Sequence, residues 1–135
     1  MDLDKALGIA ASAMDAQTTR LRVIAENLAN QDTTGSKPGA DPYRRKTVTF
    51  ENRLDRQLGT ATVRVKQIGR DAGEFQQHYD PSNPAANADG YVKLPNVNSL
   101  VEVMDMREAE RSYSANLAVM QASRSMLTRT IDLLK

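Results

Sequence analysis

Apolar residues recur at heptad spacing at both ends of this 135-residue chain, and this pattern constrains the fold more than any other feature. In the N-terminal part the steps alternate between four and three residues, with one gap at Gln17. No proline interrupts the pattern, so it predicts a helix from about Asp4 to Asn30. The apolar positions of this first seam are Leu3, Leu7, Ala10, Met14, Leu21, Ile24 and Leu28.

A second seam predicts a helix from Ser99 to the end of the chain. Ser99 and Glu102 have the spacing of a capping box, in which both side chains bond backbone amides of the first turn. Glu110 and Arg124 occupy polar gaps in this seam. Its apolar positions are Val103, Met106, Tyr113, Leu117, Met120, Leu127, Ile131 and Leu134.

The same helix carries a second apolar stripe, formed by Ala115, Val119, Ala122, Met126 and Leu133. A hairpin of two helices needs only one stripe on each helix. Because the chain offers only one other long helix, the second stripe predicts contacts with further subunits.

The segment between the helices lacks the heptad pattern. Residues 62–66 alternate between apolar and polar, and residues 44–50 do so weakly, which predicts a small β-hairpin within residues 43–68. Residues 79–98 contain three prolines and are predicted to be extended, ordered only by the surface against which they lie. The fold class is therefore mainly α: an antiparallel coiled-coil hairpin of residues 1–30 and 99–135, with residues 31–98 inserted as a loop, β-hairpin and extended segment.

Several kinds of chemistry are not indicated. The net charge of +1 predicts no nucleic-acid or acidic membrane surface, and the chain has no cysteine for a disulfide, thiolate metal site or thiol nucleophile. His78 is the only histidine and has no acidic neighbour before Asp80, so a surface histidine is the favoured interpretation. Asp80, Asn83, Asn87 and Asp89 do not match a calcium loop, because prolines interrupt them and no bidentate glutamate follows. We expect no enzyme activity, cofactor, metal, nucleic acid or membrane insertion.

Two further features bear on function. The start of the chain is acidic and no continuous apolar segment follows it, which predicts no cleavable signal peptide. Arg44, Arg45 and Lys46 form a compact basic run. We interpret this run as a solvated patch or as an ion-pair partner for another subunit, since no basic helix or aromatic platform accompanies it.

Long heptad helices at both termini around a variable insert resemble the axial proteins of the bacterial flagellum, the rod and hook proteins. Residues 29–35 (ANQDTTG) resemble the family motif at the end of the first helix, although Ser36 stands where that family usually has a tyrosine. Residues 42–50 (PYRRKTVTF), 87–92 (NADGYV) and 95–98 (PNVN) resemble signatures of its proximal rod members, and residues 111–116 (RSYSAN) resemble a shared segment of the second helix. The matching motif residues are Ala29, Asn30, Thr33, Gly35, Tyr43, Arg44, Arg45, Lys46, Asp89, Gly90, Tyr91, Pro95, Asn96 and Asn98.

The resemblance implies a structural subunit of the proximal rod, the drive shaft that links the membrane ring to the distal rod and hook in flagellum-dependent motility. It implies export by the flagellar type III apparatus and polymerisation in the periplasm. The implied partners are copies of the same chain, other proximal and distal rod subunits, and the junction of membrane ring and export gate. A cytosolic coiled-coil adaptor is the alternative, and a peptidoglycan-cutting enzyme is a third interpretation that lacks an acid–base pair.

Overall fold

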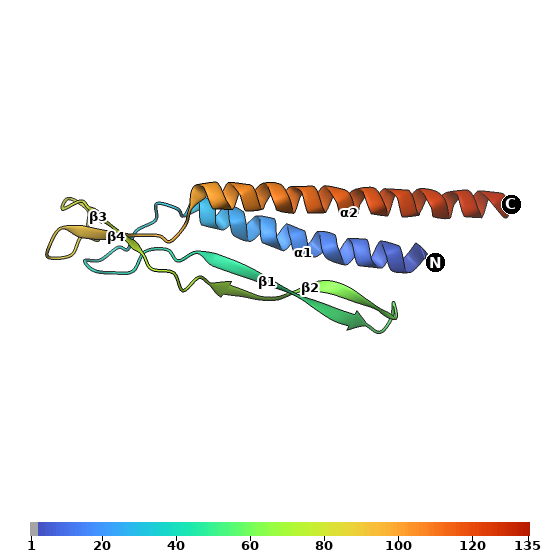
Figure 1. Ribbon diagram of the computed structural model, residues 1–135, viewed down its shortest axis with the longest axis horizontal. Helices are drawn as coiled ribbons and strands as arrows, with labels where there is room; N and C mark the ends of the chain where they lie inside the picture. The colour runs from blue at the N-terminus through green and yellow to red at the C-terminus, as the bar shows by residue number, and fades with distance from the viewer. Residues whose placement is uncertain (1–2) are drawn as a thin grey trace. The chain divides into compact units, whose positions relative to one another are not determined.

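The computed structural model describes residues 3–135. Two long helices lie at the ends of the chain, and the strands between them form two separate two-stranded sheets (Figure 1). In chain order the elements are α1 (Leu3–Ala29), β1 (Lys46–Asp55), β2 (Thr60–Arg70), β3 (Gln76–Tyr79), β4 (Tyr91–Leu94) and α2 (Ser99–Leu133). The predicted mainly α-helical chain with long terminal helices and an inserted β-hairpin is therefore confirmed. Neither helix contains, within the described residues, a segment long and apolar enough to cross a membrane.

α1 ends just before Asn30, whose backbone and side chain both bond the last turn of the helix. The backbone amide of Asn30 donates to the carbonyl of Glu26 over 3.1 Å, and its side-chain amide donates to the same carbonyl over 2.8 Å. Thr33 Oγ1 in turn donates to Asn30 Oδ1 over 3.1 Å. Short polar side chains of this kind compete with the helix for backbone groups, which explains why the helix stops within one residue of the predicted position.

The N-terminus of α2 corrects the predicted capping box. Asn98, not Ser99, caps the helix, since its Oδ1 accepts hydrogen bonds of 3.0 and 3.3 Å from the second and third backbone amides that follow it. Glu102 does not reach back to the helix end; its side chain is fully buried and bonds Arg45. The prediction was wrong because Asn and Ser are equally good caps, and the local sequence does not contain the distant partner of Glu102.

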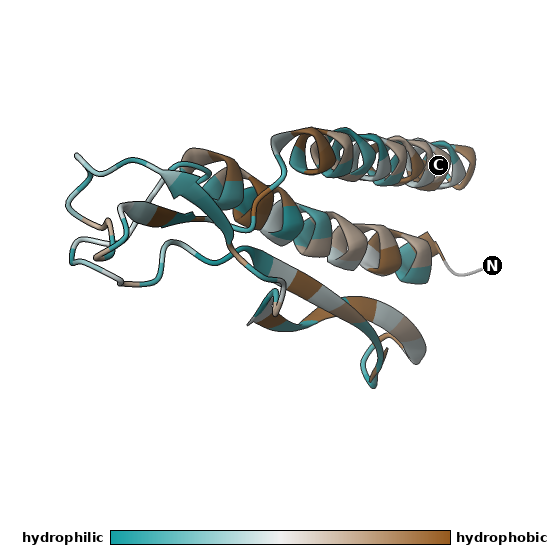
Figure 2. Cartoon of the chain, turned by 60° about the vertical axis from the view of Figure 1, so that its left-hand side comes forward, coloured by the Kyte–Doolittle hydropathy of each residue, from teal (hydrophilic) through white to brown (hydrophobic). Residues whose placement is uncertain are grey.

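β1 and β2 form the predicted hairpin, but both strands are longer than the alternating segments suggested. The turn of residues 56–59 is held by Asp55, whose Oδ1 accepts from the amides of Gln57 and Leu58 over 2.9 and 3.2 Å. The amide of Gly59 donates to the carbonyl of Asp55 over 2.8 Å. Figure 2 shows hydrophobic and hydrophilic residues interchanging along both strands. A hairpin with this pattern buries one face and leaves the other exposed.

The second sheet was not predicted. β3 and β4 pair antiparallel with Gln76 opposite Leu94 and Tyr79 opposite Tyr91, and the two tyrosine rings meet edge to face at 5.4 Å. Gly90 turns the chain into β4 with a φ of 85°. The prolines that argued against strands lie in the loop between β3 and β4 and in the segment after β4, where no ladder hydrogen bond is needed.

Two compact units make up the described chain. The terminal unit comprises α1 up to Leu21, residues Val48–Gln67 and residues Met106–Lys135. The central unit comprises residues Arg22–Thr47 and Ile68–Asp105. Buried residues of the terminal unit are small (Ala10, Ala16, Thr62, Ala109 and Ser123), whereas those of the central unit include Val23, Ile24, Asn27, Val92 and Glu102. Within the terminal unit, Arg20 of α1 forms an ion pair of 3.6 Å with Glu108 of α2, so the two helices adjoin there.

Candidate functional site

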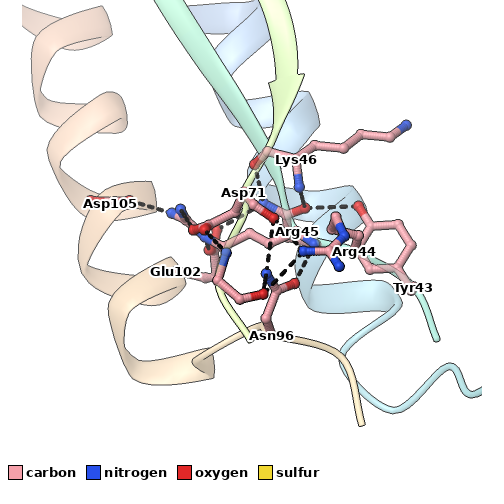
Figure 3. A network of polar contacts seen from close by, with 10 residues as sticks. Tyr43, Arg44, Arg45, Lys46, Asp71, Asn96, Glu102 and Asp105 are labelled. Carbon is pink, nitrogen blue, oxygen red and sulfur yellow. Dashed lines mark hydrogen bonds and ion pairs between the residues drawn. The ribbon is translucent and has the colours of Figure 1, made fainter. Parts of the chain in front are cut away.

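A polar network joins several segments of the central unit (Figure 3). We call it the Arg45 cluster; its members are Asn27, Tyr43, Arg44, Arg45, Lys46, Asp71, Asn96, Glu102 and Asp105. They come from the last turns of α1, the segment that leads into β1 and the first residue of β1, the segments that follow β2 and β4, and the first turns of α2. Segments far apart in the sequence are therefore joined at this point.

Arg45 is the cation of the cluster. Its Nε donates to the fully buried carboxylate of Glu102, while the two terminal nitrogens lie 3.4 Å from Asp71 and 3.5 Å from Asp105. Burial alone would lower the pKa of the Arg45 guanidinium, but the hydrogen bond and charge of Glu102, followed by those of Asp71, raise it. Removing one partner of such a buried pair leaves an uncompensated charge, which costs roughly 3–5 kcal/mol.

Asn27 is the second buried centre of the cluster, and its side chain bonds β1 as a neighbouring strand would. Its Nδ2 donates to the carbonyl of Lys46 over 2.9 Å, and its Oδ1 accepts from the amide of Lys46 over 2.9 Å. The Asn27 side chain makes two more hydrogen bonds: its Nδ2 donates to Glu102 over 3.2 Å, and its Oδ1 accepts from the Tyr43 hydroxyl over 2.7 Å. All four hydrogen-bonding positions of the Asn27 amide are therefore occupied. Burial is the main cause that raises the pKa of Tyr43.

Arg44 and Asn96 connect the cluster to the loop that follows β2. Arg44 stacks on the ring of Phe75 at 4.2 Å and donates to the carbonyls of Asp71 and Gly73 over 2.8 and 3.0 Å. Asn96 donates to the same two carbonyls over 3.2 Å and accepts from the amide of Arg45 over 2.8 Å. Two side chains thus bind the backbone of one short loop, and the Asp71 side chain holds the same loop by accepting from the amide of Gly73 over 2.8 Å and pairing with Arg45.

The basic run of residues 44–46 is therefore not the solvated patch or the inter-subunit ion-pair partner that we predicted. Arg45 pairs with three carboxylates of its own unit, and Lys46 pairs with Glu26 at 2.8 Å. The error arose because three adjacent cations look solvent-exposed in the sequence, whereas their counter-charges lie 20 to 60 residues away along the chain. The cluster stabilises the fold and contains no group arranged for catalysis.

The remaining motif residues also have local structural positions. Pro95 is buried, and Asn98 caps α2. Asn87 Oδ1 accepts from the amides of Asp89 and Tyr91, each over 3.0 Å, which shapes the turn at Gly90. Ala29, Asn30, Thr33 and Gly35 lie at the end of α1 and in the loop that follows it.

The residues considered for metal or acid–base chemistry have ordinary surroundings. Asp80 Oδ1 accepts from the hydroxyl of Ser82 over 2.6 Å, and Asn83 Oδ1 accepts from the amide of Ala85 over 2.9 Å. His78 lies exposed on β3. Among residues 3–135 no group of three potential ligands gathers as a metal site would require.

The predicted packing residues fall into two classes of exposure. In the first seam Ala10 and Ile24 are buried and the rest are half-buried. In the second seam Met106, Tyr113, Met120 and Leu127 are half-buried, whereas Val103, Leu117, Ile131 and Leu134 are exposed. The second stripe is exposed throughout, with Val119, Met126 and Leu133 at 50%, 54% and 87%.

Asn27 and Glu102 are the residues that sequence reasoning missed. Each is a polar residue in a long amphipathic helix, and nothing adjacent in the sequence marks it as buried.

Comparison with known proteins gives the class of the chain. The family model described as "Flagella basal body rod protein" matches residues 7–37, and the model described as "Flagellar basal body rod FlgEFG protein C-terminal" matches residues 88–133. The first match covers most of α1 and the loop after it, and the second covers β4 and α2. Fold and matches together define a flagellar rod protein.

The relatives are more specific. The flagellar basal-body rod protein FlgC of Agrobacterium fabrum is 56% identical over 133 residues, which cover 98% of this chain and 96% of the relative. The FlgC proteins of Bacillus subtilis and Salmonella typhimurium are 39% and 42% identical, over 94% and 93% of this chain and 95% and 92% of their own lengths. The chain belongs to the FlgC family of flagellar basal-body rod proteins. It is a structural component of the rod in the flagellar basal body and not an enzyme, as predicted.

Proposed function

We propose that the chain polymerises, with copies of itself and with other proximal and distal rod subunits, into the proximal part of the rod. In this position it transmits torque from the membrane ring to the distal rod and hook, and its innermost copies meet the junction of ring and export gate. The helical core comprises residues 1–30 and 99–135, and residues 31–98 form the insert.

The exposed apolar surface of α2 is the observation that carries this proposal. Val119, Met126 and Leu133 follow one another at seven-residue spacing on α2 and are half or more exposed in the free chain. Burial of apolar surface stabilises an assembly by about 25 cal/mol per Å². A stripe of this length therefore supports packing against a helix of another subunit, with the second stripe and the two seams as the packing residues.

The two helices of each subunit pack as an antiparallel coiled-coil hairpin in the proposed rod. The ion pair of Arg20 and Glu108 supports this arrangement, because it joins the C-terminal half of α1 to the N-terminal part of α2. Long helices joined side by side resist bending and twisting better than loops, which suits a drive shaft.

Export through the flagellar type III apparatus, without a cleavable signal peptide, would bring the chain to the periplasm. The absence of cysteine supports this route, since no disulfide can form before the chain reaches its site of assembly. The small buried residues of the terminal unit also favour easy unfolding for export.

Isolated basal bodies test the proposal. Cells that lack the gene should be non-motile, and the plasmid-borne chain should restore swimming. Mass spectrometry should find the chain in purified rods with an uncleaved N-terminus. A cytosolic coiled-coil adaptor would instead stay in the cytosolic fraction, and that result would contradict the proposal.

A further inference from the structure

The terminal unit contains an open hollow of about 370 Å³ between α1, the β1–β2 hairpin and α2. Its apolar lining is provided by Ala13, Phe50 and Val63. Its polar lining is provided by Gln17, Glu51, Asn52 and Ser112. A mixed lining of this kind fits a side chain that has an apolar stem and a polar end.

Two acceptors that line the hollow have no hydrogen-bond or ion-pair partner among the described residues. Gln17 Oε1 is buried and accepts no hydrogen bond from the described residues. The carboxylate of Glu51 makes no ion pair within residues 3–135. A buried acceptor without a donor is destabilising, so a partner that supplies donors would be stabilised there. The hollow therefore selects for a cation with several N–H groups.

An arginine meets these requirements better than a lysine. Its planar guanidinium carries five donors, can bond a carboxylate with two of them, and stacks on aromatic rings. Phe50 supplies such a ring in the hollow. The same chain already shows this contact in its central unit, where Arg44 lies 4.2 Å from the centre of the Phe75 ring.

Arg124 is the arginine whose surroundings match the hollow. It occupies a polar gap in the second seam, with the apolar Met120 one turn before it and Leu127 one turn after it. The residue is exposed, and its guanidinium has no hydrogen-bond or ion-pair partner among the described residues. An exposed cation flanked by apolar residues is complementary to a hollow of mixed lining that contains unpaired acceptors.

We propose that Arg124 of one copy inserts into the hollow of a second copy, where it bonds Gln17 and Glu51. This inference rests on the proposed assembly of the chain with copies of itself and assigns one contact within it. A single polar contact in an otherwise apolar helical interface fixes the register, because every other register leaves the charge without a partner. The pair would thus set how far one subunit is displaced along its neighbour.

Charge exchange tests the contact, because every copy carries both partners. Glu51→Arg and Arg124→Glu should each lower the amount of the chain in purified basal bodies by roughly tenfold or more, since each places like charges together. The double variant carries the exchanged pair in every contact and should recover most of the loss. Thr49→Arg is the matched control, since it adds the same charge to an exposed position of β1 outside the hollow. Circular dichroism of the free chains verifies that all variants fold alike.

Disulfide formation gives a second, independent measurement. The chain has no cysteine, so cells that express one chain with Asn52→Cys and another with Arg124→Cys can link these positions only between copies. Basal bodies oxidised under mild conditions should contain a covalent dimer that is absent when either variant is expressed alone. Normal assembly of both charge variants, no recovery in the double variant, or no dimer would overturn the inference. If unaltered wild-type chain is missing from basal bodies, the proposed function itself fails.

Discussion

The two units of this chain stabilise themselves in different ways. The central unit buries charged and polar side chains and satisfies them internally, as the four hydrogen bonds of Asn27 and the three carboxylates around Arg45 show. The terminal unit buries mainly small residues and leaves large apolar ones exposed, with Leu133 at 87% and Leu134 at 83%. The first turns of α2, which belong to the central unit, expose apolar side chains as well, with Leu100 at 68% and Met104 at 63%, so the contrast lies in what each unit buries.

This difference separates folding from assembly. A buried polar network has one satisfied arrangement, so the central unit specifies its own structure before any partner is present. Exposed leucines and methionines gain free energy only when another surface covers them. The central unit therefore defines the shape of the subunit, and the terminal unit derives much of its stability from the rod.

The largest expected effect is on assembly. Ile131→Asp should abolish swimming, because the half-exposed Ile131 lies on the second seam and an unpaired carboxylate buried in the rod costs several kcal/mol in every copy. The free subunit should keep its melting temperature, since the side chain is 49% exposed there. Soft-agar motility and immunoblots of cell fractions provide the measurement.

Ser125→Asp is the control for this variant, because Ser125 is exposed and belongs to neither apolar stripe. Cells that express Ser125→Asp should swim normally. If Ile131→Asp cells also swim normally, the C-terminal part of α2 is not a packing surface of the rod.

Hydrogen exchange should separate the two units in the free subunit. A helix with little burial opens easily, so amides of residues 3–21 and 106–133 should exchange orders of magnitude faster than those of the central unit. Incorporation into rods should slow exchange in the two helices most. Strong protection of both helices in a verified monomer would refute the division of roles.

Loss of the central cation should unfold the subunit rather than block its contacts. Arg45→Ala leaves the fully buried Glu102 without its cation and should lower the free energy of unfolding by roughly 3–5 kcal/mol. Urea denaturation of the purified chain measures the loss. The double variant Arg45→Met with Glu102→Leu removes both charges of the buried pair, so part of the stability should return. The recovery is incomplete because Asn27 loses its bond to Glu102, and Asp71 and Asp105 lose their cation. A single variant as stable as the wild type would show that the pair contributes little.

Gly90→Ala should have a smaller effect on the same unit. The φ of 85° costs an L-residue about 1–2 kcal/mol, and the added Cβ would lie 2.8 Å from the ring of Tyr79. Gly39→Ala isolates the backbone cost, because Gly39 has a φ of 73° and open space around it. Thermal unfolding should therefore show a larger loss at position 90 than at position 39. Equal losses would mean that the tyrosine contact adds nothing.

The terminal unit was easier to predict from the sequence than the central unit. The seams place α1 and α2 within a residue or two of their bounds because periodicity is a local signal that repeats over many turns. The Arg45 cluster could not be predicted, since each of its bonds joins residues far apart in the sequence. Glu102 illustrates this: its spacing from Ser99 fits a capping box, and only the fold shows that Arg45 takes its carboxylate. The β3–β4 pair was missed because four-residue strands have too little pattern to outweigh nearby prolines.

The smallest expected effect concerns the edge of the cluster and its dependence on pH. The hydrogen bond from Lys46, at 2.8 Å, holds the pKa of the Glu26 carboxyl below its ordinary value, although burial opposes this. Because the pKa is lower in the folded than in the unfolded chain, the pair stabilises the fold above the ordinary carboxyl pKa of about 4.3. That contribution is lost as the pH falls through the folded pKa. The melting temperature of the wild type should therefore fall slightly more between about pH 6 and pH 3 than that of Glu26→Gln.

Asp32→Asn is the control, since Asp32 is exposed and has no ion pair among the described residues, and it should follow the wild type. Identical pH profiles for Glu26→Gln and the wild type would show that solvent screens the pair completely.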